Sequence, residues 1–449
     1  MAEVQHRKLK SGLNLYVVPY NSPFTYFQLF TPFGGNVLRY RDPKTGKEVN
    51  LQPGSAHYFE HVLFIVPPES YGKPLEWATN TPDTCPNLRD GITLLQNNRA
   101  NDVNGYTSTD ITNYVFMSRV NQLENLAIML QYVFCPFLPK DRFAEEAETI
   151  SKEAGMLADK IRRKQLYQWA AQAFHQHGAR FPIIGTEESI RAISLEDVLS
   201  MHSTFYTPSN MTLLVTGQVD MDKLAEMVQT TLDSFGKGHY VQPPQMILQD
   251  EPRAVVVPDN FNDPIVREDI DRPKVLAGWK YMLDPTIDIK DLIRRKLAVQ
   301  FVGSALFGNG SRNRERLVKE GIDDRTFGSG ASDSRDYSDL YVMADTDDPE
   351  RFRKLVLDSA VQAAERGLPA EEIDYARLVM RKDARAVREV IFNFGYELAT
   401  YGVQTGNPIN YLASLELLTQ MSEAEINALA REILTPDSFT AVLAVPKGK

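Results

Sequence analysis

The stretch Gly54-Ser55-Ala56-His57-Tyr58-Phe59-Glu60-His61-Val62-Leu63-Phe64 decides how the rest of the chain is organised. Its spacing predicts a helix that begins near Ser55, just after a proline and a glycine. His57 and His61 are one helical turn apart, so both imidazoles project from one face and can bind one ion together. Glu60 borders the same face. This is the layout in which two imidazoles hold zinc and a carboxylate activates a water molecule.

A hydrolytic zinc site needs three protein ligands and one open position, so the motif is one ligand short. The order His-x-x-Glu-His is that of the inverted zincins. A second predicted helix, over residues 142–153, carries acidic residues that can supply the missing ligand. Glu146 and Glu153 are two turns apart and share a face, whereas Glu145 and Glu148 point elsewhere. The sequence therefore predicts that this helix completes the metal site.

The composition is that of an ordinary globular protein, with 449 residues, 43% hydrophobic and 24% charged. The formal net charge of −10 argues against a nucleic-acid partner, because binding to phosphates needs clustered positive charge. Two cysteines are too few for a disulfide framework. No window approaches the length of an apolar membrane span, and the first ten residues hold no apolar core of signal-peptide length. We therefore expect a cytoplasmic protein without a membrane partner.

A repeated pattern divides the chain. Ser194-Leu-Glu-Asp197 is typical of a capping box, and a helix to about residue 205, a Thr-Pro turn and an apolar strand follow it. Ser422-Glu-Ala-Glu425 begins the same series 228 residues later, since 422 − 194 and 436 − 208 agree. That shift is nearly half of the chain length. The pattern therefore predicts a tandem duplication of one α+β domain.

The two copies are predicted to meet at residues 236–264, where prolines and glycines are dense enough for an extended linker. This places a first domain at residues 1–235 and a second at residues 265–449. All seven histidines fall at or before His239. The second domain thus has no imidazole for a metal, and we expect a homologous copy without metal that shapes the cavity.

The motif helix and the acidic helix together resemble the zinc metallopeptidases of the pitrilysin and insulinase family, which include the mitochondrial processing peptidases. The resemblance implies one zinc ion per chain, bound by His57, His61 and Glu153. It makes Glu60 the catalytic base and Glu146 a supporting residue that orients a ligand. It also implies two homologous tandem domains, each a mixed, largely antiparallel sheet packed against helices, which hold a peptide substrate between them.

Two strands are predicted ahead of the motif helix, at Leu13–Pro19 and Phe24–Phe30. Between Pro67 and Asn98 the sequence is irregular, and we expect an inserted surface loop. The stretch Asn101–Ser108 resembles the family's Asn-Ala-x-Thr strand, with Asn104 as the matching asparagine and a glycine in place of the usual alanine. Edge strands in this family receive the peptide by strand addition, which makes Asn104 a substrate-binding candidate. Alternatively, Asn104 is a turn residue.

A pair of residues that many relatives use to stabilise the oxyanion is missing from its expected place. Relatives carry an arginine and a tyrosine, seven apart, in the second half; here Val318 or Arg316 meets the first position and Asp323 or Asp324 the second. Either a homologous second subunit supplies the pair, in a heterodimer or a homodimer, or zinc and another donor suffice.

The resemblance predicts a zinc-dependent endopeptidase that acts on peptides or peptide precursors and is completed by a partner subunit. The competing hypothesis is a catalytically weak or inactive scaffold subunit of a peptidase complex.

Overall fold

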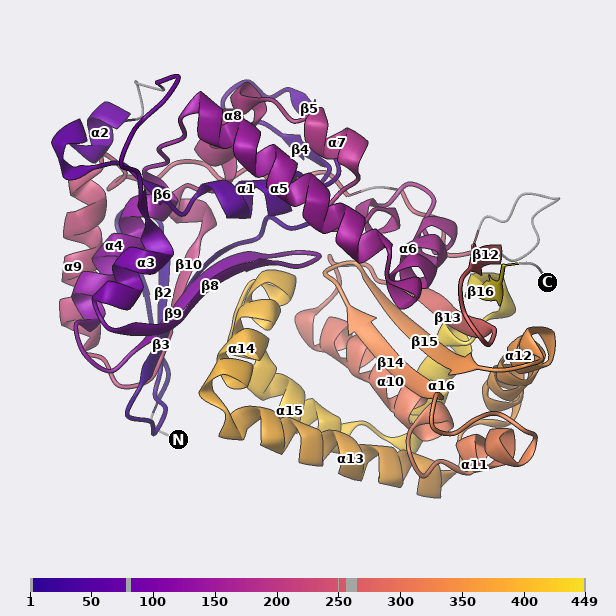
Figure 1. Cartoon of the computed structure of the whole chain (residues 1–449). Helices are drawn as coiled ribbons and strands as arrows, with labels where there is room; N and C mark the ends of the chain where they lie inside the picture. The colour runs from indigo at the N-terminus through magenta and orange to yellow at the C-terminus, as the bar shows by residue number, and fades with distance from the viewer. Residues whose placement is uncertain (1–2, 78–81, 249, 256–264, 448–449) are drawn as a thin grey trace. The chain divides into compact units, whose positions relative to one another are not determined.

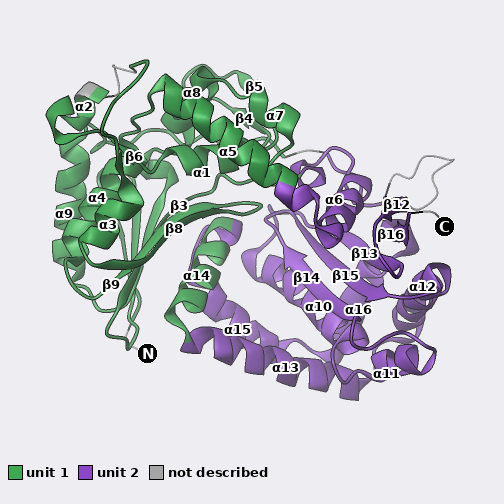
Figure 2. Cartoon of the chain, viewed as in Figure 1, with its two compact units in different colours: residues 1–155, 182–248, 390–403 green, residues 156–181, 249–389, 404–449 purple. Residues whose placement is uncertain are grey.

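The computed structural model describes residues 3–77, 82–248, 250–255 and 265–447. They form two compact units, each with its own β-sheet packed against helices (Figure 1). Unit 1 comprises residues 1–155, 182–248 and 390–403, and unit 2 comprises residues 156–181, 249–389 and 404–449 (Figure 2). The prediction of an α+β fold with two largely antiparallel sheets is confirmed.

Unit 1 is built on a six-stranded sheet in the order β1-β2-β10-β3-β9-β8. The β2–β10 pair is parallel and the other pairs are antiparallel. Every residue of β3, at the centre, is buried, so both faces of the sheet are covered there. The strands are β1 (Gln5–Lys8), β2 (Asn14–Val18), β3 (Thr25–Thr31), β8 (Ala100–Thr107), β9 (Thr112–Ser118) and β10 (Thr212–Thr216).

Helices cover this sheet, and two small sheets accompany it, in the orders β11-β4-β5 and β6-β7. The short strands are β4 (Arg39–Arg41), β5 (Glu48–Asn50), β6 (Ile65–Val66), β7 (Arg89–Asp90) and β11 (Gln245–Met246). The helices are α1 (Ser55–Val62), η1 (Glu69–Tyr71), α2 (Pro74–Trp77), α3 (Gly91–Asn97), α4 (Gln122–Phe134), α5 (Lys140–Ala158), α7 (Glu187–Arg191), α8 (Leu195–Phe205), η3 (Pro208–Asn210), α9 (Met221–Ser234) and α14 (Ile391–Thr405).

Unit 2 repeats this plan with a five-stranded sheet in the order β12-β16-β13-β15-β14. Its strands are β12 (Ile265–Glu268), β13 (Lys274–Met282), β14 (Gly328–Asp333), β15 (Tyr337–Asp345) and β16 (Phe439–Pro446). Its helices are α6 (Ile161–Ala173), η2 (Gly178–Arg180), α10 (Ile289–Phe307), α11 (Arg312–Lys319), α12 (Pro349–Arg366), α13 (Ala370–Glu389), α15 (Asn410–Gln420), α16 (Glu423–Ile433) and η4 (Pro436–Ser438).

The predicted repeat is present in the secondary structure. The series α8, η3, β10 recurs as α16, η4, β16, and the helices begin 228 residues apart, since 423 − 195 is 228. Ser194 caps α8 in a reciprocal capping box, and the Ser422 side chain caps α16 by accepting from the Glu425 amide. The same local signals therefore start the same helix in both copies.

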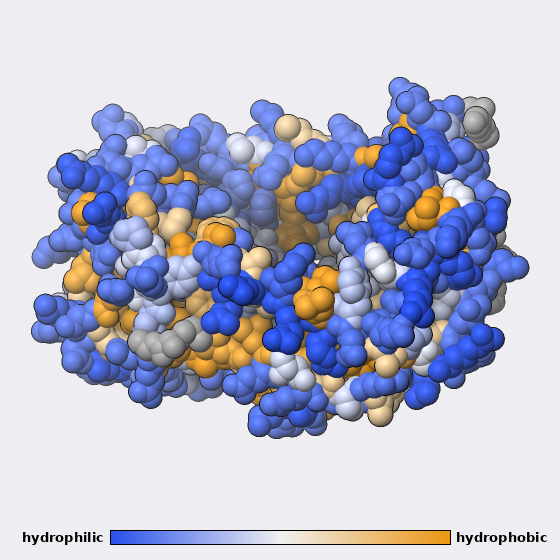
Figure 3. Space-filling model, turned by 90° about the horizontal axis from the view of Figure 1, so that it is seen from below, coloured by the Kyte–Doolittle hydropathy of each residue, from blue (hydrophilic) through white to orange (hydrophobic). Residues whose placement is uncertain are grey.

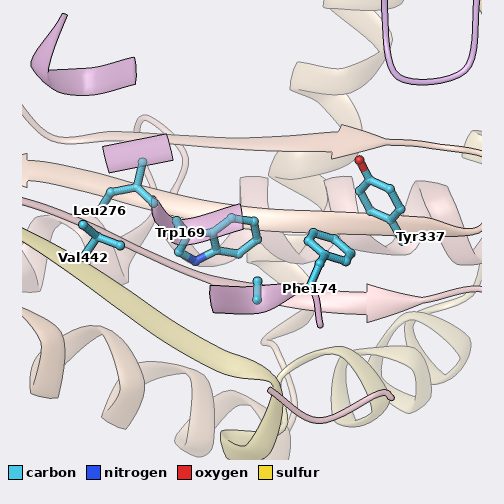
Figure 4. Packing of buried hydrophobic residues seen from close by; sticks show 6 residues of the cluster. Trp169, Phe174, Leu276, Tyr337 and Val442 are labelled. Atoms are coloured by element: carbon cyan, nitrogen blue, oxygen red, sulfur yellow. The ribbon is translucent and has the colours of Figure 1, made fainter. Parts of the chain in front are cut away.

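Each unit contains a segment from the other half of the chain. Residues 156–181, with α6, belong to unit 2, and residues 390–403, with most of α14, belong to unit 1. In unit 2, Trp169 of α6 lies against Leu276 and Val442 of the sheet (Figure 4). The compact units thus differ from the predicted domains at 1–235 and 265–449 by this exchange. The division of the sequence into two homologous copies stays a separate prediction.

Polar side chains fix α6 to the sheet of unit 2 as well. Gln165 donates to the carbonyls of Lys274 and Val442, and the Trp169 indole donates to the carbonyl of Thr440. Because these side chains are buried, leaving them without partners would cost about 1–3 kcal/mol each. The bonds therefore specify where α6 lies on its own sheet.

The prediction for residues 67–98 was wrong in part. The predicted surface loop contains η1, α2 and α3, while residues 78–81 lie outside the described part. The Asp90 side chain accepts hydrogen bonds from the amides of Ile92 and Thr93 and so starts α3.

The two strands predicted ahead of the motif helix are present as β2 and β3, shifted by about one residue at their ends. Within the predicted linker at residues 236–264, Gln245–Met246 forms strand β11 and pairs with β4, while residues 249 and 256–264 lie outside the described part.

Hydrophilic residues dominate the surface in the view of Figure 3, and apolar residues form smaller patches between them. Among the described residues, no helix combines the length and the apolarity that a membrane-spanning segment needs.

Candidate metal centre

The motif helix α1 begins where the sequence predicted. Gly54 stands at its N-cap with a φ of 91°, and a Cβ there would lie 2.7 Å from the carbonyl oxygen of Ile184. Only glycine fits this position without strain. The side chains of Tyr58 and Phe59 are buried and pack the helix into unit 1. The Tyr58 hydroxyl donates to the carbonyl of Phe143 at 2.7 Å. That bond fixes α1 against α5, the helix with the acidic residues.

The structure brings His57, His61 and Glu153 together, with one ligand atom of each within 4.8 Å of the others. The two imidazole rings lie 4.7 Å apart, centroid to centroid. His61 Nε2 is 3.6 Å from Glu153 Oε2. With zinc–ligand bonds of about 2.0–2.2 Å, ligand atoms of a tetrahedral site lie about 3.4 Å apart, so this spacing suits zinc. The three residues that the sequence proposed as ligands thus form one group.

Glu146 lies on the other side of the His61 ring. Its Oε2 is 3.7 Å from His61 Nδ1, and its Oε1 is 3.8 Å from the guanidinium of Arg142. A carboxylate at this position is suited to orient the imidazole of a histidine ligand. Glu145 and Glu148 turn away, as predicted, toward Arg142 and Arg191.

The protonation states of the group suit a metal. Burial and the neighbouring His61 lower the pKa of His57 to about 4, so its imidazole is neutral at physiological pH. Its Nδ1 is buried without a hydrogen-bond partner among the described residues. A neutral imidazole with an unpartnered nitrogen is suited to bind a metal, because metal binding needs the deprotonated form of histidine. These residues therefore fit zinc.

The pKa values of His61 and Glu60 are raised. Burial alone would lower the pKa of His61, but Glu146, Glu60 and Glu153 outweigh it and raise that pKa. Burial raises the pKa of Glu60, although a hydrogen bond from Thr107 opposes the shift. A buried carboxyl with a raised pKa suits a group that takes up and releases a proton.

The group lines a cavity of about 620 Å³ in unit 1. One wall is α1 and the other is β8, the edge strand of the sheet. Asn104 is exposed and lines this cavity from β8, so it is a strand residue and not a turn residue. A bulge between Asn101 and Asn104 shifts the β8 register, and Asp102 inside it has a φ of 47°.

Gly105, where the family resemblance leads us to expect an alanine, has a local explanation. A Cβ at this position would lie 3.0 Å from the ring of Phe64 and 3.2 Å from Glu60 Cγ. The phenylalanine at the end of the motif stretch therefore fills the space that the alanine methyl would need.

Sequence reasoning missed Thr107, whose hydroxyl donates to Glu60 Oε2 at 2.8 Å. Tyr106 and Arg142 also line the cavity and were not predicted. Alternation along the strand gave a usable signal for Thr107, because Gly105 and Thr107 share the face that meets α1.

The second half offers several arginines and tyrosines near the expected oxyanion pair, and the structure gives three of them other contacts. Tyr337 is part of the buried core of unit 2, and Arg325 pairs with Asp323. Tyr341 lies beside Gly330, where its hydroxyl is 2.5 Å from the place of a Cβ.

Comparison with known proteins gives consistent results. Residues 192–380 match the family model described as the peptidase M16 inactive domain. A relative in Bacillus subtilis, the uncharacterized zinc protease YmfH, is 24% identical over 98% of this chain and 96% of its own length. A solved structure from Alicyclobacillus acidocaldarius, described as an M16-like peptidase, matches with a TM-score of 0.85 and 23% identity over 99% of this chain and 98% of its own. A protease from Helicobacter pylori matches with a TM-score of 0.78 and 18% identity, covering 99% of this chain and all of its own.

Fold and site together define a protein of two α+β units, one of which carries a His-His-Glu group beside a buried glutamate. The family model, the relatives and the fold together support the resemblance of this chain to the pitrilysin and insulinase-type M16 peptidases. The matched inactive domain, residues 192–380, excludes His57, His61 and Glu153. The name of that family model therefore describes a part of the chain outside the metal group.

Proposed function

We propose that the protein is a zinc-dependent endopeptidase that hydrolyses peptides or peptide precursors. One observation carries the proposal: three metal-ligating side chains, His57, His61 and Glu153, converge in the cavity that Glu60 also lines. Zinc proteases among the relatives support the peptidase assignment.

His57, His61 and Glu153 would hold one zinc ion. When bound, such an ion supplies Lewis acidity that makes water nucleophilic near neutral pH. Glu60 takes the proton from the attacking water and later returns it to the leaving amine. Glu146 holds His61 by its second ring nitrogen and keeps the imidazole turned toward the cavity.

The edge strand β8 gives the substrate a place to bind. One side of β8 pairs with β9, and no strand of the described residues pairs with its other side. A peptide that adds to this edge forms main-chain hydrogen bonds, which give affinity with little dependence on sequence. Asn104, exposed on β8 and lining the cavity, is the proposed side-chain contact.

A partner subunit is part of the proposal. The arginine and tyrosine that many relatives use are absent from their expected register, and losing one oxyanion donor costs about 10²–10³-fold in rate. A homologous second subunit, in a heterodimer or a homodimer, would restore this stabilisation. The isolated chain is then a weak peptidase.

The test begins with zinc per chain, measured by metal analysis on the wild type, His61→Ala and Glu60→Gln. We expect close to one zinc in the wild type, loss of zinc in His61→Ala, and retained zinc without peptide hydrolysis in Glu60→Gln. If the wild type takes up no zinc, even when zinc is offered, the proposal of an enzyme is overturned. The alternative of an inactive scaffold subunit would then remain. A single subunit that hydrolyses peptides at ordinary enzyme rates would overturn the need for a partner.

A further inference from the structure

The carboxylate of Glu60 is held by a side chain on the facing strand. Glu60 is buried on α1, and its Oε2 accepts a hydrogen bond of 2.8 Å from Thr107 Oγ1 at the end of β8. Both residues line the cavity of unit 1. The bond therefore crosses from the metal helix to the strand proposed to bind the substrate.

The surroundings fix the direction of this bond. Thr107 Oγ1 also lies 3.5 Å from Thr112 Oγ1, but Thr112 donates its own proton to the carbonyl of Phe33 at 2.7 Å. A carboxylate at 2.8 Å is the stronger acceptor for the Thr107 hydroxyl than a second hydroxyl at 3.5 Å. The Thr107 proton is therefore directed at Glu60.

Packing alone confines the stem of Glu60 but not its carboxylate. Gly105 leaves room for Glu60 Cγ, and the ring of Phe64 lies on the same side. These contacts restrict the first torsions of the side chain, whereas rotation about the terminal torsion is broad without a hydrogen bond. The Thr107 hydroxyl provides that bond and so distinguishes one carboxylate oxygen from the other.

We propose that Thr107 is a positioning residue, whose hydroxyl holds one oxygen of Glu60 so that the other oxygen meets the proton of the attacking water. The inference rests on the proposed peptidase function and deepens it. Placement matters because a misplacement of about 1 Å at a reacting group costs on the order of 10²-fold in rate.

The experiment compares Thr107→Val, which removes the hydroxyl at nearly constant shape, with Thr107→Ser, which keeps it. The matched control is Thr31→Val, because Thr31 is a buried threonine of the same sheet that donates to the carbonyl of Phe205. On the zinc-loaded chain with its partner, we expect kcat to fall roughly ten- to a hundredfold in Thr107→Val. KM and zinc content should stay unchanged, and Thr107→Ser and Thr31→Val should keep kcat near the wild type.

A kcat of Thr107→Val within about twofold of wild type would overturn the proposal, since an aligned general base contributes on the order of 10²–10⁴-fold. So would an equal loss in Thr107→Ser or Thr31→Val, because either result would indicate a general loss of packing.

Crystal structures of the zinc-loaded wild type and Thr107→Val give a second readout that needs no activity. We expect the Glu60 carboxylate to turn away in the variant, and an unchanged carboxylate would overturn the inference. If the zinc-loaded wild type cleaves no peptide with any partner, the proposed function fails, and these structures still decide whether Thr107 orients Glu60.

Discussion

The cavity of unit 1 and the cavity of unit 2 lie at the same place in their own folds, between a helix and the edge strand of the sheet. In unit 1, His57, Glu60 and His61 of α1 and the strand β8 line a cavity of about 620 Å³. In unit 2, three residues of α10 at the same spacing line a cavity of about 390 Å³ beside β14, namely Gln300, Gly303 and Ser304. The first set can hold a metal and move a proton, and the second can do neither.

The comparison teaches that the duplicated fold supplies a cavity at an edge strand, while the chemistry depends on a few side chains of one helix. The acidic helix differs in the same way. Glu153 of α5 belongs to the candidate metal group, whereas among the described residues unit 2 contains no such group of His, Cys, Asp or Glu side chains. Unit 2 therefore has a cavity at the same place as unit 1 but lacks the residues that could bind a metal there.

The largest effect is expected when unit 1 receives the residues of unit 2. His57→Gln, Glu60→Gly and His61→Ser together should remove zinc and lower peptide hydrolysis by at least about 10³-fold, while the chain still folds. Metal analysis, circular dichroism and a peptide assay measure this. The control is Ser304→Ala in unit 2, which should keep both zinc and hydrolysis. Hydrolysis that survives the triple change within about tenfold would place the chemistry elsewhere.

The next effect concerns the pH dependence of stability in unit 2. Burial and Asp333 raise the pKa of Asp339 from 3.8 to about 7. Because the folded state binds this proton more tightly than the unfolded state, its stabilisation is present below about pH 4 and is lost as pH rises to about 7. Asp339→Asn should therefore gain stability relative to wild type over this range, by up to about 4 kcal/mol. Urea unfolding between pH 4 and pH 8 measures it.

A matched variant should behave in the opposite way. Burial alone would raise the pKa of Asp336, but the hydrogen bond with His177 and nearby positive charge lower it. Its stabilisation is present above the unfolded pKa and is lost as the pH falls. Asp336→Asn should thus be least stable, relative to wild type, near neutral pH. If both variants shifted in the same direction, the assigned charges would be wrong.

A smaller effect is expected at Gly105, where the two walls of the metal cavity meet. Gly105→Ala places a methyl 3.0 Å from Phe64 and 3.2 Å from Glu60, which should cost about 1–2 kcal/mol of stability and lower kcat. Thermal unfolding and kinetics report the two losses. Phe64→Leu should relieve the clash, so the double variant should recover part of both. A double variant no better than Gly105→Ala alone would contradict this explanation.

The smallest effect is expected on the outer side of α5. Glu148 is half exposed and pairs with Arg191, so Glu148→Gln should leave both the stability and the bound zinc nearly unchanged. Glu153→Gln, on the same helix, should weaken zinc binding by at least about tenfold. Zinc titration separates the two variants, and equal affinities would remove Glu153 from the ligand set.

The parts of the fold that the sequence predicted depend on local signals. Ser194 and Ser422 start equivalent helices through their own side chains, and the spacing of His57 and His61 places both on one face of α1. Glu153 required the family resemblance, because helical spacing separates it from Glu145 and Glu148 but not from Glu146.

The parts that the sequence did not predict depend on contacts between distant segments. Thr107 meets Glu60 across 47 positions of the chain, and Phe64 explains Gly105 only once α1 and β8 lie side by side. The cap at Asp90 was a local signal for α3, but the prolines around it concealed a short helix. Nothing in the composition of α6 or α14 indicates which sheet each one covers.

The segment 390–403 in unit 1 has a consequence for the timing of synthesis. Gly395 lies against Tyr26 and Gln28 of β3, and Tyr396 contacts Tyr106, which lines the metal cavity. A ribosome that has made the whole metal site has therefore not yet made the helix that covers the sheet behind it. Because domains generally fold as units, unit 1 stays incomplete until residues 390–403 have also been made. The fold around the candidate metal group should therefore be completed only after the strands and helices of unit 2 that precede residue 390 have been made.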